Sequence, residues 1–310
     1  MTDHIDRSAD RYTVAVTSTA ENNPHSFALQ MIGAGRSVLE IGCAAGHVTE
    51  QLVAAGNEVV GVEFDSAAAA RAERFAQRVH RLDLDRDRIT EFEHDEFDVL
   101  LAGDVLEHLR DPLATLTDAL QLLRPDGEVI ISVPNAAHAD VRLHLLEGRF
   151  EYASEGLLDH THMRWFTRAS LREMLAEAGL TAVELRRVMC PVGGSNVGVD
   201  LSIHSRAVIE FVTADPDHDT FQFVVRCQRT ARGCEDALAA LQHEWPRHSC
   251  DEVDELRLYA KNLRAALDLW ETSRHAKLRN LQRRWLDRIR TVAQGRKASA
   301  EHLRGDRSDA

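Results

Sequence analysis

The segment SVLEIGCAAGHVTEQL, residues 37–52, contains the signals that decide the fold. Its apolar start, Ser37–Ile41, predicts a buried strand, and the spacing of apolar residues from Val48 onward predicts a helix. Gly42 and Gly46 lie in the turn between them, where glycine lets the backbone approach a ligand without a Cβ in the way. The start of the following helix offers free N–H groups. Strand, turn and helix together predict an α/β sheet with a small-molecule site at this turn.

The turn does not match a dinucleotide site, which requires the pattern GxGxxG for a pyrophosphate. It reads Gly-Cys-Ala-Ala-Gly, and Glu40 stands two residues before the first glycine. An acid at that position repels phosphate and suits a cationic or amino-bearing ligand.

Two further acids follow predicted strands. Glu63 follows the strand Glu58–Val62 and stands about 20 residues beyond Gly42, where open α/β sheets hold a ribose diol. Asp83 follows a third predicted strand, residues 78–82, and suits an adenine amino group. The alternative is that both acids are helix caps.

Three segments, taken together, resemble the class I S-adenosylmethionine-dependent methyltransferases. Residues 38–46 resemble their motif I, residues 97–109 their fourth strand and the turn after it, and residues 123–135 their fifth strand. The resemblance covers residues 20 to 228. It implies a Rossmann-like, seven-stranded, mostly parallel sheet with helices on both faces and a late antiparallel hairpin. The family more often has glycine where Ala45 stands and aspartate where Glu63 stands.

The resemblance also implies S-adenosyl-L-methionine as the cofactor and gives roles to individual residues. The methionine part of the cofactor is expected beside Glu40, Gly42, Cys43 and Gly46. The ribose is expected at Glu63 and the adenine at Asp83. The side nearest the sulfonium is expected to be lined by Ala102, Gly103 and Asp104.

Two polar segments offer groups that could activate an acceptor hydroxyl, which needs a base or a metal to remove its proton. The first carries Asp104, Glu107 and His108 just past the fourth strand. The second, residues 156–167, carries Asp159, His160 and His162, and it resembles a segment of methyltransferases that modify sugars and surface glycans. Aromatic side chains nearby are expected either to form walls for a sugar or to belong to the core, namely Tyr152, Trp165 and Phe166.

These polar residues allow three interpretations. His162 or His108 is a general base, or Glu107, His108 and His162, with Asp104, bind Mg²⁺ or Mn²⁺. The second arrangement resembles the metal site of small-RNA 3′-terminal 2′-O-methyltransferases. In the third interpretation, Glu107 and His108 only cap the turn.

The predicted function is methyl transfer to a hydroxyl of a sugar or saccharide. The alternatives are a quinone or other phenolic small molecule, or the terminal ribose of an RNA. A non-catalytic protein that binds S-adenosylmethionine is an alternative of another class. Residues 1–228 are the predicted methyltransferase domain.

The charge distribution argues against a nucleic-acid partner. The net charge is −13, yet residues 274–310 hold eleven Lys/Arg and four Asp/Glu, so the remainder carries −20. An acidic body with a basic tail is not the pattern of a domain that grips nucleic acid along its length. Five scattered cysteines without a CxxC pair disfavour a disulfide framework, and no apolar run is long enough to span a membrane. A cytoplasmic location is expected.

Residues 229–310 are predicted to be a helical extension. Apolar residues at 3-4-3 spacing, namely Leu256, Tyr259, Leu263, Ala266 and Trp270, predict a helix–helix seam and a homo-oligomer. Basic residues crowd the part that follows. They favour, as an alternative, a helix that lies on an anionic membrane at its inner face or on an acidic partner. The remaining alternative is a solvated helix.

Overall fold

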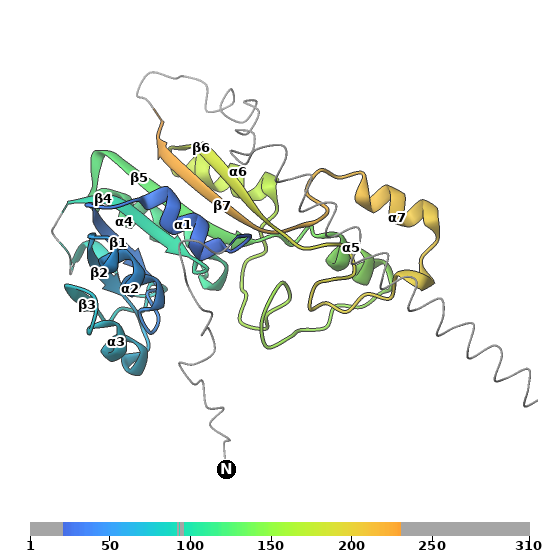
Figure 1. Cartoon of the computed structure of the whole chain (residues 1–310), viewed down its shortest axis with the longest axis horizontal. Helices are drawn as coiled ribbons and strands as arrows, with labels where there is room; N and C mark the ends of the chain where they lie inside the picture. The colour runs from blue at the N-terminus through green and yellow to red at the C-terminus, as the bar shows by residue number, and fades with distance from the viewer. Residues whose placement is uncertain (1–20, 92, 94–95, 231–310) are drawn as a thin grey trace, which may run out of the picture. The chain divides into compact units, whose positions relative to one another are not determined.

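The computed structural model describes residues 21–91, 93 and 96–230, which belong to one compact unit of the chain, Met1–Asp251. Seven strands form a single sheet in the order β3-β2-β1-β4-β5-β7-β6 (Figure 1). Strand β7 is antiparallel to β5 and β6, and the other neighbours are parallel. The predicted Rossmann-like sheet with its late hairpin is confirmed. The strands are β1 (Ser37–Ile41), β2 (Glu58–Val62), β3 (Arg78–His80), β4 (Phe97–Gly103), β5 (Leu123–Pro134), β6 (Leu180–Met189) and β7 (Thr220–Arg229).

The central strands are apolar on both faces, as parallel strands covered by helices on each side must be. Leu39 of β1 pairs with Val60 of β2 on one side and with Leu100 of β4 on the other. All three side chains are buried. This register brings the carboxyl ends of β1, β2 and β4 to one edge of the sheet. The turn after β1, Glu63 and Asp104 therefore lie at the same edge.

Helices cover both faces of the sheet, as predicted. Helices α1 (Pro24–Ile32) and α2 (His47–Ala54) share one apolar cluster with alternate strand residues such as Val38 and Val59. Helices α4 (Pro112–Ala119) and α6 (Arg168–Glu177) share the opposite cluster, which contains Leu39. Asn23 caps α1, and Thr167 and Ser170 form a capping box at α6. The remaining short elements of this part are α3 (Ser66–Ala72), η1 (Ile89–Glu91), η2 (Leu106–His108) and η3 (Leu120–Leu122).

A smaller group of elements follows β5 and was not predicted from the sequence. It contains α5 (Ala139–Leu146), η4 (Leu201–Ile203) and α7 (Arg206–Thr213), and α5 and α7 lie beyond the sheet in Figure 1. Leu143 of α5 and Val212 of α7 belong to one buried cluster. The buried carboxylate of Asp140 accepts hydrogen bonds from the backbone of Gly193 and Ser195, at 2.6 and 3.0 Å. These contacts fasten the loop after β6 to α5.

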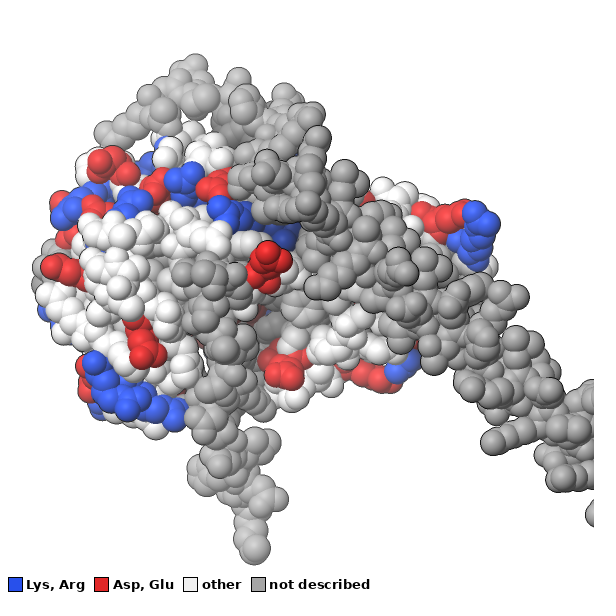
Figure 2. Space-filling view, viewed as in Figure 1, with Lys and Arg blue, Asp and Glu red and all other residues white. Residues whose placement is uncertain are grey.

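Charged side chains form ion pairs across the neighbouring strands β5, β7 and β6. Glu128 of β5 contacts Arg36 at 2.7 Å and Arg226 of β7 at 3.2 Å, and Arg226 also reaches Glu184 of β6 at 3.0 Å. Figure 2 shows acidic and basic side chains interleaved on the face that it displays. Within the described part of the chain, no helix is both long enough and apolar enough to cross a bilayer.

The third strand ends at His80 and not at residue 82, because Arg81 lies beyond the last residue that pairs with β2. The three cysteines in the described part, Cys43, Cys190 and Cys227, are free. Arg229, the first residue of the predicted extension, belongs to β7. The rest of that extension from residue 231 on, with its seam and the oligomer built on it, lies outside the described residues.

Candidate active site

The turn after β1 depends on its two glycines for reasons internal to the chain. Gly42 and Gly46 have φ of 72° and 84°, in the region that favours glycine. A Cβ on Gly42 would overlap the side chain of Val105, and one on Gly46 would lie 2.8 Å from Cα of Ala72. The sequence predicted that these glycines leave room for a ligand. The structure adds that they let the turn pack against η2 and α3.

The third unusual residue of this turn is Ala44, which has φ of 46°. A side chain in this left-handed region is costly, so glycine would be the natural choice there. The resemblance to the methyltransferase family predicts glycine at the position of Ala45. In the structure the left-handed backbone falls one residue earlier, and Ala45 is an ordinary buried residue. Strained backbone of this kind is found most often at ligand sites.

Glu63 is held in place by the turn. Its Oε2 accepts from the backbone N–H of Ala44 at 3.0 Å, and its Oε1 accepts from that of Asp65 at 2.8 Å. Burial raises the pKa of the Glu63 carboxyl, against the opposing effect of these hydrogen bonds. The cap of α3 is Asp65, so Glu63 is not a helix cap. Its carboxylate is oriented beside the turn, where the ribose was expected.

Asp83 is not a helix cap either. It lies in the turn after β3, accepts from the backbone N–H of Asp85 at 3.1 Å and contacts Arg86 at 3.3 Å. Its side chain is half exposed. The structure therefore leaves it available to a ligand at the outer end of the site.

Glu40 and Cys43 lie beneath the turn. The Thr49 hydroxyl donates to Oε2 of Glu40 at 2.6 Å, and burial raises the pKa of Glu40 to about 7. The Cys43 thiol packs against Gly61 of β2. Burial raises the pKa of that thiol, with the carboxylates of Glu40 and Glu63 adding to the effect. The thiol therefore serves as packing.

Asp104 begins the turn after β4 with a φ of 57°, the second left-handed side chain at this edge. The Ser132 hydroxyl donates to Oδ1 of Asp104 at 2.7 Å, and the Gln222 amide donates to the same oxygen. Ala102 and Gly103 precede it at the end of β4, where Ala102 is buried. The three residues expected near the sulfonium thus form the end of β4 and the start of this turn.

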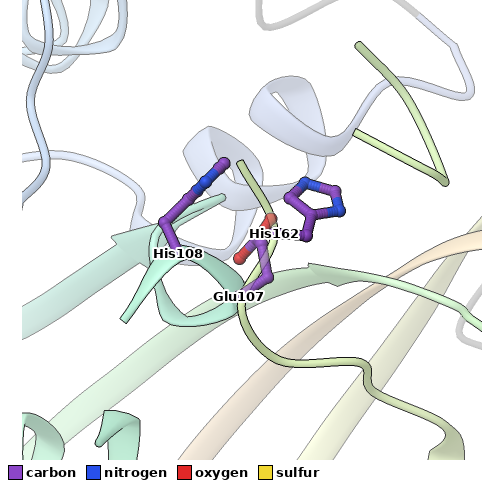
Figure 3. A group of neighbouring side chains, drawn as sticks. All are labelled: Glu107, His108 and His162. Atoms are coloured by element: carbon purple, nitrogen blue, oxygen red, sulfur yellow. The ribbon is translucent and has the colours of Figure 1, made fainter. Parts of the chain in front are cut away.

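The two polar segments predicted to activate an acceptor come together. Glu107, His108 and His162 each offer one ligand atom, and these atoms lie within 4.8 Å of one another (Figure 3). The carbonyl of Glu107 accepts from the backbone of Met163 and Arg164, at 2.8 and 2.9 Å, which fastens the second segment to η2. Asp104 lies outside this group of three, and the Ser132 hydroxyl and the Gln222 amide both donate to its Oδ1. We call Glu107, His108 and His162 the His–Glu cluster.

The cluster contains buried polar atoms that lack a hydrogen-bond partner within the described part of the chain. Oε2 of Glu107 and Nδ1 of His162 are buried and have no hydrogen-bond partner among the described residues. Burial, with the charges of Asp104 and Asp159, raises the pKa of Glu107 well above its usual range. Burial and the nearby His108 lower the pKa of His162 to about 4, so its ring is neutral near pH 7. A proton donor or a cation would satisfy these atoms, so the cluster fits either a substrate hydroxyl or a divalent metal.

Aromatic rings border the cluster. The His162 ring packs edge-on to Trp165 with 5.6 Å between centroids, and Phe150 packs against Trp165 and Tyr152 at 5.4 and 5.3 Å. Phe166 is buried in the main core, so its predicted role as a wall is wrong. Phe150 was missed, although it stands two residues before Tyr152 in the sequence.

Known proteins resemble this chain in sequence and in fold. Residues 16–185 match the family model of a methyltransferase domain. A ubiquinone biosynthesis O-methyltransferase of Aromatoleum aromaticum is 29% identical over 156 residues, which are 49% of this chain and 67% of that protein. One of Aeromonas salmonicida is 26% identical over 191 residues, 59% and 78% of the two chains. A solved structure of an S-adenosylmethionine-dependent methyltransferase of Archaeoglobus fulgidus has a TM-score of 0.49 and 18% identity, and covers 66% of this chain and 92% of its own.

Proposed function

The chain belongs to the class I S-adenosylmethionine-dependent methyltransferases, and on that premise we propose that it methylates a hydroxyl group on a phenolic or quinone-derived small molecule. The observation that carries the proposal is the convergence of Glu107, His108 and His162 on one place at the carboxyl edge of the sheet. We also propose that Glu63 contacts the ribose of the cofactor and Asp83 its adenine, as the resemblance implies.

The reaction requires the acceptor oxygen to lose a proton as it attacks the methyl carbon of the sulfonium, while S-adenosylhomocysteine leaves. Positioning of the two reactants supplies much of the rate, and a base or a metal supplies the proton step. A neutral imidazole in the His–Glu cluster would accept the proton. The aromatic rings of Phe150, Tyr152 and Trp165 would contact an acceptor ring through their faces and edges.

The acidity of the acceptor favours a phenol over a sugar. His162, with a pKa of about 4, is a weak base. A phenol ionises near pH 10, and an aliphatic hydroxyl resembles water, with a pKa near 16, so the mismatch with a sugar is greater by about six powers of ten. The relatives named as ubiquinone biosynthesis O-methyltransferases support the same choice. They give no support to the predicted saccharide acceptor.

A divalent ion is the second candidate for the proton step, and the unpartnered Glu107 Oε2 and His162 Nδ1 favour it. Glu107, His108 and His162 would hold Mg²⁺ or Mn²⁺. Such an ion, when bound, lowers the pKa of a coordinated hydroxyl. The chain's own part would be to fix the geometry of the three ligands.

The test is methyl transfer from labelled S-adenosylmethionine onto two matched panels, one of mono- and dihydroxy aromatic compounds and one of saccharides. Transfer to the aromatic panel alone is expected. Transfer to saccharides alone would overturn the acceptor assignment, and cofactor binding without transfer to either panel would favour the non-catalytic alternative.

The same assay separates the two candidates for the proton step. If a base acts alone, activity after dialysis against chelator should equal that of untreated protein. If a metal acts, activity should fall on chelation and return with Mg²⁺ or Mn²⁺. Glu107→Gln keeps the size of the side chain but removes the carboxylate that would bind the ion, and it should abolish that recovery.

A further inference from the structure

We propose that Thr161, oriented by Asp159, is a positioning residue that fixes which nitrogen of His108 carries the proton. The kinetic consequence rests on the proposed function, whereas the tautomer itself rests on geometry alone. Neither residue belongs to the His–Glu cluster, and both stand in the segment that brings His162 to it.

The side chain of Asp159 is only 2% exposed. The backbone N–H of Thr161 donates to Oδ1 of Asp159 at 2.7 Å, which establishes this oxygen as an acceptor. The Thr161 hydroxyl lies 2.7 Å from the same oxygen and donates its one proton there. After that bond, the Thr161 hydroxyl has only electron pairs left to offer.

Those electron pairs face His108. Oγ1 of Thr161 lies 3.1 Å from Nδ1 of His108, and the carbonyl oxygen of Thr161 lies 3.3 Å from the same nitrogen. A carbonyl oxygen can only accept, and the hydroxyl has already donated, so Nδ1 of His108 must donate to both. In a neutral imidazole the other nitrogen, Nε2, then carries the lone pair. Nε2 is therefore the atom through which His108 can take a proton or bind a metal.

Thr161 also stands next to His162 in the chain, so the residue that orients the first ring adjoins the second ring of the cluster. Positioning of this kind typically contributes 10- to 100-fold to a metal site or to activity.

The matched variants are Thr161→Val, which keeps the branched shape but loses the hydroxyl, and Thr161→Ser, which keeps the hydroxyl. ¹⁵N NMR of the His108 ring, assigned with His108→Ala, reports which nitrogen is protonated. We expect protonated Nδ1 in the wild type and in Thr161→Ser, and a population with protonated Nε2 in Thr161→Val. The Thr161 carbonyl remains as an acceptor in all three proteins, so the change in Thr161→Val should be partial.

The kinetic test measures methyl transfer to the acceptor that the aromatic and saccharide panels identify. Thr161→Val should lower kcat about tenfold, with unchanged affinity for S-adenosylmethionine and an unchanged melting temperature, while Thr161→Ser should restore kcat. Protonated Nε2 in the wild type would overturn the proposal. The proposal would also be overturned if Thr161→Val had the kcat of the wild type while His108→Ala had a lower kcat. If no acceptor is methylated at all, the proposed function fails, but the NMR result still decides the tautomer.

Discussion

Ala44 donates a backbone hydrogen bond to Oε2 of Glu63 over 3.0 Å, so the left-handed turn after β1 and the carboxylate at the end of β2 hold each other in place. This contact orients Glu63 before any ligand binds. A carboxylate oriented in advance loses little freedom when it accepts further hydrogen bonds.

Replacing Glu63 should weaken cofactor binding. Hydrogen bonds to a charged acceptor contribute about 1.5–3 kcal/mol each, so Glu63→Ala should lower the affinity for S-adenosylmethionine at least about tenfold. Isothermal calorimetry measures this directly. Glu58→Ala, at the exposed opposite end of the same strand, is the control and should bind normally. Normal affinity in a folded Glu63→Ala protein would show that the ribose does not contact this carboxylate.

Glu40 should make the stability of the ligand-free protein depend on pH. Its pKa rises from 4.5 to about 7 on folding because of burial, so the folded state holds a proton that the unfolded state releases. The stabilisation associated with that proton is present below pH 4.5 and is lost as the pH rises to about 7. The loss amounts to about 3 kcal/mol, and Glu40→Gln avoids it.

Urea unfolding near pH 5 and near pH 8 tests this. The free energy of unfolding of Glu40→Gln, relative to wild type, should be higher at the upper pH by about 2–3 kcal/mol. The difference between the two proteins removes the contribution of other titrating groups. A difference that does not vary with pH would mean that Glu40 titrates normally in the fold.

The two alanines of the turn should respond differently to glycine. At Ala44 the left-handed backbone costs about 1–2 kcal/mol, which offsets the entropy that glycine adds to the unfolded chain. Ala44→Gly should therefore leave the free energy of unfolding unchanged or raise it by up to about 1 kcal/mol. Ala45→Gly removes a buried methyl and gains nothing, so it should destabilise by about 1 kcal/mol or more. Equal effects at the two positions would contradict the assignment of strain to Ala44.

The central strands could be predicted from the sequence because the local composition of each strand indicates that it is buried. Ser37–Ile41 and Glu58–Val62 are short apolar runs with polar residues or glycine at their ends, and both have the predicted bounds. The group formed by α5 and α7 could not be predicted in this way. Its cluster joins Leu143 to Val212, which are far apart in the sequence, so neither segment shows its buried face alone.

The site shows the same limit. The resemblance correctly brought the segments of Glu107 and His162 together, and its inclusion of Asp104 among the metal ligands stays a prediction. It could not show which residue holds Asp104. Asp104 is engaged by Gln222, a residue of β7 that lies far along the chain. Only the folded sheet brings the two together. The handedness of Ala44 is likewise a property of backbone torsion, to which the residue type gives no clue.

The role of His162 is tested most directly by turnover and cofactor affinity in His162→Ala, with His160→Ala as the control. His160 stands two residues away, is exposed, and lies outside the His–Glu cluster. We expect His162→Ala to lose about 10²–10⁴-fold in methyl transfer while its affinity for S-adenosylmethionine stays normal, and His160→Ala to keep both. Near wild-type turnover in His162→Ala would contradict it, since His162 could then be neither the base that takes the acceptor proton nor a ligand of a metal that the reaction needs.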